Sequence, residues 1–259
     1  MRLTPGLSAL LLSLLLLGAC ENGNPNNRSD SLGQETRTLA SAAQPAHTPG
    51  SRGVIINNAK LLRQFGAQGV NLNRAIYTRY FLTRRENHQP DAILVLVPGF
   101  EGGASNFYVL AENLLRRARD NANLVLEVWA VDRRANHLED TVGLDIAEDL
   151  NEPLVGLDFL FGEELGLDLS PALVEGPNRR AEFYNTSTDT AFMAQWTTLV
   201  HSQDIDAVVE HARQTARAGN VFLGGHSAGT GYTARYAATD FNLDGGTPEP
   251  GFDKLRGLI

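Results

Sequence analysis

The sequence predicts an α/β fold with a mostly parallel central sheet, flanking helices and a helical insertion. Stretches typical of strands alternate with helical stretches through residues 53–259, the pattern of parallel strands joined by right-handed crossovers. Residues 92–97 form a continuous apolar run, which favours a central strand buried on both faces. A second apolar run, at residues 221–223, leads through a glycine-rich turn into a helix.

The other strands are predicted from their β-branched and aromatic residues. Such residues dominate residues 75–83, and Trp129 lies in the apolar run 124–131. We also expect short strands at residues 54–56 and at 254–259, where a further strand begins.

Helices are predicted where apolar side chains recur with helical spacing. Residues 104–119 carry Phe107 on the apolar side of an amphipathic pattern. Residues 202–218 begin with acidic side chains, which suit the N-terminus of a helix. Two more helices are expected at residues 190–199 and 228–238.

Residues 1–19 have the pattern of a targeting segment. Arg2 supplies a positive start, and residues 7–17 are apolar but too short to span a bilayer. Residues 17–20 read L-G-A-C, which resembles the lipobox of bacterial lipoproteins. This resemblance implies cleavage before Cys20, the only cysteine, and a lipid on its thiol. The alternative is an ordinary secretory signal followed by a chance cysteine.

Residues 20–52 are rich in polar and small side chains, and we interpret them as a flexible tether. A lipid anchor implies a membrane partner and a location in the bacterial cell envelope. Glu21 follows the cysteine where an aspartate would favour retention, so the outer membrane is expected in a Gram-negative host. The net charge is −8 with no basic patch, which argues against a nucleic-acid partner.

Residues 225–229 read G-H-S-A-G and fit the pattern G-x-S-x-G between a predicted strand and helix. Gly225 and Gly229 would allow a turn too tight for side chains, and Ser227 would stand at its apex. The helix N-terminus there favours developing negative charge. A glycine-rich turn with an idle serine is the alternative.

With this motif the sequence resembles the α/β-hydrolase superfamily, and the serine esterases and lipases within it. A glycine-rich loop at residues 98–103, after the strand 92–97, resembles the oxyanion loop of that family. Relatives often carry histidine before the glycine where this chain has Pro98. The resemblance implies that the N–H groups of Phe100 and Ala228 form the oxyanion hole.

An insertion is predicted at about residues 138–188. Residues 138–178 hold eleven acidic and no basic residues, and short apolar clusters broken by glycine and proline predict short helices. In the family such an insertion is commonly a lid, here an apolar cap over an acyl-binding pocket. A solvated helical excursion is the other interpretation. The acidic-basic turn at residues 132–134 is usually structural in relatives.

A serine nucleophile needs a histidine base and an acid, which in this family follow the serine in the chain. All the histidines precede Ser227: His47, His88, His137, His201, His211 and His226. We consider three acidic residues that follow it, and none stands after a complete later strand: Asp244, Glu249 and Asp253. We therefore expect an N-terminal fragment that lacks the acid and the base. Recruitment of His137 or His201 in an unusual order is the alternative.

The leading hypothesis is a membrane-tethered serine hydrolase that cleaves carboxylic esters through an acyl-enzyme on Ser227. No cofactor is implied, and residues 241–252 lack a ligand spacing that would indicate a metal. The alternative is an inactive envelope lipoprotein that uses the same fold for binding. A histidine in a loop after the last strand of the complete protein would favour the enzyme.

Overall fold

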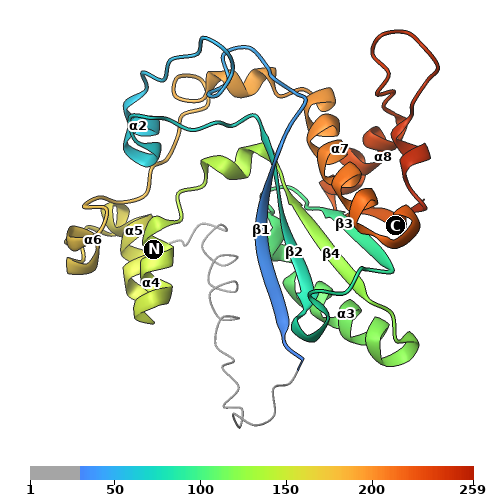
Figure 1. Cartoon of the computed structure of the whole chain (residues 1–259). Helices are drawn as coiled ribbons and strands as arrows, with labels where there is room; N and C mark the ends of the chain where they lie inside the picture. Colours follow the sequence, from blue (N-terminus) through green and yellow to red (C-terminus); the bar gives the residue numbers. More distant parts are fainter. Residues whose placement is uncertain (1–29) are drawn as a thin grey trace. The chain divides into compact units, whose positions relative to one another are not determined.

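The computed structural model describes residues 30–259, and residues 32–259 form one unit around a six-stranded sheet (Figure 1). The strands are β1 (Leu32–Ala40), β2 (Arg74–Leu82), β3 (Ala92–Val97), β4 (Leu126–Asp132), β5 (Val221–Gly225) and β6 (Gly257–Leu258). Their order across the sheet is β1-β2-β4-β3-β5-β6. The predicted signal peptide 1–19, Cys20 and the start of the predicted tether lie outside the described residues.

The sheet is mixed, with a parallel centre. β3 pairs in parallel with β4 and with β5, and β5 pairs in parallel with β6, whereas β1 pairs antiparallel with β2 and β2 pairs antiparallel with β4. The predicted α/β fold class is confirmed. Because β4, β3 and β5 are parallel neighbours, the loops that follow them meet at one edge of the sheet. That edge holds the predicted site.

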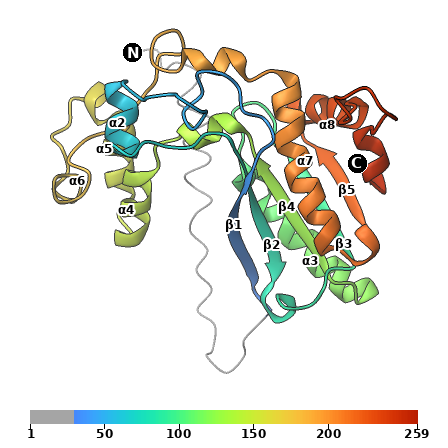
Figure 2. The same ribbon diagram turned by 45° about the horizontal axis from the view of Figure 1, so that its top comes forward.

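Helices cover both faces of the sheet (Figure 2). α3 (Tyr108–Ala122) packs on one face, and α7 (Thr198–Thr215) and α8 (Ala228–Ala238) pack on the other. Alternate side chains of β3 point to opposite faces of the sheet and pack against the helices there. Ile93 belongs to the buried cluster of α7, and Leu94 belongs to that of α3. This two-sided burial explains why the strand is apolar throughout.

The insertion is helical, as predicted. It contains α4 (Val142–Leu150), α5 (Pro153–Leu165) and α6 (Pro171–Glu175), which lie together at the side of the sheet (Figure 1). Phe159 and Leu173 are fully buried in a separate apolar cluster among these helices. The insertion therefore has a small core of its own, apart from the clusters on the two faces of the sheet.

The predicted tether 20–52 is wrong from residue 32 onward, because β1 pairs with β2 over nine residues. β1 has no buried side chain, so the sequence lacks the hydrophobic period that would indicate a strand. Main-chain hydrogen bonds along an edge hold it. Just after β1, the Ser41 hydroxyl donates to Asp204 on α7 at 2.5 Å, which fastens this segment to the domain.

Other boundaries differ from the prediction. Residues 54–56 belong to no strand, and the last strand is confined to β6. α2 (Ala59–Phe65) was not predicted; the Asn58 side chain caps it by accepting from two backbone N–H groups. The predicted helices 190–199 and 202–218 are a short 3₁₀ turn followed by the single helix α7.

Short 3₁₀ turns complete the described fold: η1 (Thr83–Arg85), η2 (Ala104–Phe107), η3 (Arg134–Leu138), η4 (Ala191–Gln195), η5 (Arg217–Gly219) and η6 (Gly251–Lys254). Among the helices of residues 30–259, none has the length and apolar character needed to cross a bilayer.

Candidate active site

Ser227 stands on a sharp turn between β5 and α8. Its backbone has φ 54° and ψ −121°, a conformation that non-glycine residues rarely adopt and that costs roughly 1–3 kcal/mol. The residue is exposed, as are its neighbours His226 and Ala228. A strained backbone that presents a hydroxyl to solvent at a helix N-terminus is the geometry of a nucleophile elbow.

Both glycines of the motif are sterically required. A Cβ on Gly225 would lie 2.5 Å from the carbonyl carbon and oxygen of Gly229, where α8 begins. A Cβ on Gly229 would overlap the carbonyl oxygen of Val97 and lie 2.9 Å from that of Pro98. The elbow can therefore form only because β5, α8 and the end of β3 approach one another without side chains between them.

The glycine-rich loop after β3 lies directly against the elbow. A Cβ on Gly99 would be 3.0 Å from the Cβ of Ser227, so the two backbones are in close contact. The N–H of His226 donates to the carbonyl of Val97 at 3.1 Å, which joins the ends of β5 and β3. The Gly102 N–H donates to Gly99 at 3.2 Å and closes a turn around Phe100.

Two backbone amides, those of Ala228 and Phe100, are expected to form an oxyanion hole: Ala228 directly follows Ser227, and Phe100 directly follows Gly99, whose loop contacts the turn. Ala228 is the first residue of α8, so its N–H has no partner within the helix. Within residues 30–259, no hydrogen-bond acceptor is found for the N–H of Ala228 or of Phe100. The 77% exposure of Phe100 keeps the tip of its loop open to solvent.

Asp132, at the end of β4, accepts a hydrogen bond from the residue that follows the glycine-rich loop. Its Oδ1 accepts the Ala104 N–H at 2.7 Å, and a Cβ on Gly103 would lie 3.1 Å from the same oxygen. Burial raises the pKa of Asp132 to about 6, while the Ala104 hydrogen bond opposes that rise and the charge of Glu139 adds to it. Sequence reasoning treated residues 132–134 as a structural turn and did not connect Asp132 with Ala104.

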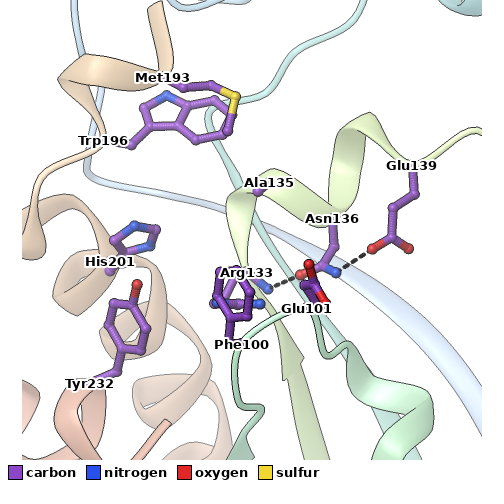
Figure 3. A pocket seen from close by; sticks show the side chains of 10 residues that line it. All are labelled: Phe100, Glu101, Arg133, Ala135, Asn136, Glu139, Met193, Trp196, His201 and Tyr232. Carbon is purple, nitrogen blue, oxygen red and sulfur yellow. Dashed lines mark hydrogen bonds between the residues drawn. The ribbon is translucent and has the colours of Figure 1, made fainter. Parts of the chain in front are cut away.

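A pocket of about 330 Å³ opens beside the elbow (Figure 3). Phe100 of the glycine-rich loop and Tyr232 of α8 are part of its wall, but Ser227 is not. Its lining residues are Phe100, Glu101, Arg133, Ala135, Asn136, Glu139, Met193, Trp196, His201 and Tyr232. No residue of α4, α5 or α6 lines it, so the predicted cap over an acyl pocket stays a prediction.

No histidine is hydrogen-bonded to the Ser227 hydroxyl within the described residues. His201 lines the pocket with its ring 5.1 Å from that of Tyr232, and burial lowers its pKa despite the nearby Asp204. Burial also lowers the pKa of His137, whose Nε2 is buried without a partner. Both imidazoles are therefore neutral at pH 7, the form that a base requires.

The acidic residues predicted as candidates after the serine lie outside the elbow contacts, and Asp240, which also follows the serine, accepts the backbone N–H groups of Asn242 and Glu249. Asp244 is in an exposed loop after α8. Glu249 is 3.2 Å from the Lys254 ammonium, and Asp253 is exposed in η6. Among residues 30–259, no group of histidine, cysteine and acidic side chains is arranged to hold a metal ion.

Solved structures resemble the chain at low identity. A candidate lipase from Sulfolobus solfataricus has a TM-score of 0.42 and 12% identity, over 82% of this chain and 42% of its own. An esterase from an Arctic intertidal metagenomic library has a TM-score of 0.39 and 12% identity, over 82% of this chain and 58% of its own. A peroxisomal α/β-hydrolase of Saccharomyces cerevisiae has a TM-score of 0.36 and 13% identity, over 83% of this chain and 44% of its own.

The chain spans about half the length of these solved structures. No protein-family model matches its sequence, and no curated protein matches it.

Proposed function

We propose that this protein is a serine hydrolase that cleaves carboxylic esters through an acyl-enzyme on Ser227. The observation that carries the proposal is the exposed, strained Ser227 in backbone contact with the loop of Gly99. A hydroxyl at that place can reach a carbonyl carbon while two free amides, on Phe100 and Ala228, receive the carbonyl oxygen.

The chemistry follows from those positions. The Ser227 oxygen bonds to the ester carbonyl carbon, its proton passes to a base, and the carbonyl oxygen becomes an oxyanion. Collapse of this intermediate breaks the ester bond and releases the alcohol with a proton. Water then attacks the acyl-enzyme, which frees the acid and regenerates the hydroxyl. The positive end of the α8 dipole further favours the oxyanion.

The base is not assigned. His201 is neutral and lies at the neighbouring pocket, but the Ser227 hydroxyl makes no hydrogen bond to it. We also propose a lipid anchor on Cys20 that would hold the enzyme at the bacterial envelope, most simply the outer membrane of a Gram-negative host.

Covalent labelling tests the proposal. The full-length gene product is treated with a fluorophosphonate, and the adduct is located by peptide mass spectrometry. We expect modification of Ser227, loss of the adduct in Ser227→Ala, and an unchanged adduct in Ser105→Ala, which alters an exposed serine of η2. Labelling elsewhere, or none in the full-length product, contradicts the proposal; complete inertness would favour an inactive binding protein.

A further inference from the structure

Arg133 differs from its neighbour Arg134 in what its guanidinium contacts. Arg134 is fully buried and makes a bidentate pair with Asp204, at 2.6 Å and 3.0 Å. Arg133 has one hydrogen bond from its guanidinium, from Nη2 to the Gly102 carbonyl at 3.3 Å. Its Nε is buried without a hydrogen-bond partner, and no carboxylate pairs with it within residues 30–259. Arg133 as a whole is half-buried, so its guanidinium carries a partly desolvated charge without a counter-charge and is suited to take one from a ligand.

The guanidinium belongs to the wall of the pocket beside the elbow (Figure 3). The other walls include aromatic and apolar side chains: Phe100, Met193, Trp196 and Tyr232. A volume of about 330 Å³ is at the small end of ligand pockets and accommodates a ring or a short chain. The pocket thus combines an apolar space with the N–H donors of one guanidinium, and this combination can orient a small carboxylic acid.

Two acidic side chains also line the pocket and affect how strongly it attracts an anionic ligand. Glu139 accepts the Asn136 amide at 2.5 Å, and in Figure 3 both lie on the side opposite His201 and Tyr232. Glu101 follows Phe100 in the oxyanion loop, is exposed and makes no ion pair with Arg133. Neither carboxylate therefore neutralises the arginine, although Glu101 should weaken the field that an anionic ligand meets.

We propose that this pocket binds a carboxylate of the substrate, with Arg133 as its partner. The inference rests on the proposed function, because Phe100 supplies both a pocket wall and one amide of the oxyanion hole. The substrate class is then a carboxylic ester in which a short apolar or aromatic spacer joins the ester to a free carboxylate. The carboxylate accepts the guanidinium N–H bonds while the spacer contacts Trp196 and Tyr232.

Binding of a matched pair of non-ester ligands tests this without turnover. Phenylacetate and neutral phenylacetamide are titrated into the full-length protein, and quenching of tryptophan fluorescence is followed. Trp196 lines the pocket, whereas Trp129, the other tryptophan, is fully buried in the sheet and gives a constant background. We expect the acid to bind at least about tenfold more tightly than the amide, because a hydrogen bond to a charged group is the stronger one.

Three variants localise the effect. Arg133→Gln should abolish the acid preference, and Glu101→Gln should increase it. Arg235→Gln, which removes an exposed charge of α8 away from the pocket, should leave it unchanged. If Arg133→Gln does not fold, the preference of the wild type for the acid over the amide and the direction in which Glu101→Gln changes it still test the carboxylate site.

Equal binding of acid and amide, absence of saturable quenching, or an acid preference that survives Arg133→Gln overturns the carboxylate site. So does weaker acid binding in Glu101→Gln. Fluorophosphonate labelling reports separately on the proposed function: labelling of Ser227 without an acid preference rejects only the pocket proposal. An acid preference without labelling rejects the hydrolase and leaves a carboxylate-binding protein.

Discussion

Replacement of Asp132 by asparagine should stabilise the protein at neutral pH. The asparagine carbonyl can still accept the Ala104 N–H that Asp132 accepts at 2.7 Å, while the buried charge is removed. Asp132→Ala, in contrast, leaves that N–H without its acceptor and should cost about 1–3 kcal/mol. The two variants therefore separate the hydrogen bond from the charge.

The magnitude follows from the pKa of Asp132, which burial raises from 3.8 to about 6. The folded state thus keeps the proton to a higher pH than the unfolded state does. As the pH rises from about 4 to about 6, the unfolded state ionises first and the folded state loses stability. At about 1.4 kcal/mol per pKa unit, the loss above pH 6 is about 3 kcal/mol. Asparagine does not titrate, so the difference in unfolding free energy between Asp132→Asn and the wild type should increase between about pH 4 and pH 6.

Urea unfolding of the wild type and Asp132→Asn at a series of pH values from 3.5 to 8 measures this difference. Other titrating groups are common to both proteins and cancel. We expect the difference in unfolding free energy to grow by about 3 kcal/mol with rising pH. A difference that stays constant across the series would refute the reasoning, because Asp132 would then ionise at its ordinary pKa.

Three further outcomes are expected. Gly229→Ala should lower stability by about 3 kcal/mol or more, since its Cβ overlaps the backbone of Val97; a thermal melt unchanged from wild type would be incompatible with the elbow geometry. Arg134→Met should cost about 3–5 kcal/mol in urea unfolding by leaving Asp204 buried and unpaired, and adding Asp204→Leu should recover much of it. Cys20→Ala should move the protein from the membrane to the soluble fraction of the producing cells, and retention at the membrane would contradict the lipid anchor.

Much of the fold is predictable because its signals are local. The run at β3 is apolar on both faces, and the turn at β5 and α8 needs glycines close in sequence. β1 was not predictable, because an edge strand without buried side chains carries no hydrophobic period. The capping Asn58 preceding α2 is a helix signal that the sequence does contain, but the helix is too short for a clear apolar stripe.

The candidate site divides in the same way. Ser227 and its glycines are adjacent in the chain, so the motif alone indicates the elbow. The bond between Asp132 and Ala104 joins residues 28 positions apart. The pocket beside the elbow likewise joins Arg133, which follows β4, to Trp196, which precedes α7. Such contacts depend on strand order, which no local spacing reveals.

The most direct measurement is a crystal structure of the full-length protein after reaction with a fluorophosphonate. We expect phosphorus bonded to the Ser227 oxygen and one phosphonyl oxygen at about 2.7–3.1 Å from the nitrogens of both Phe100 and Ala228. An adduct whose oxygens point away from these two amides, or a reagent attached to another residue, would contradict the account.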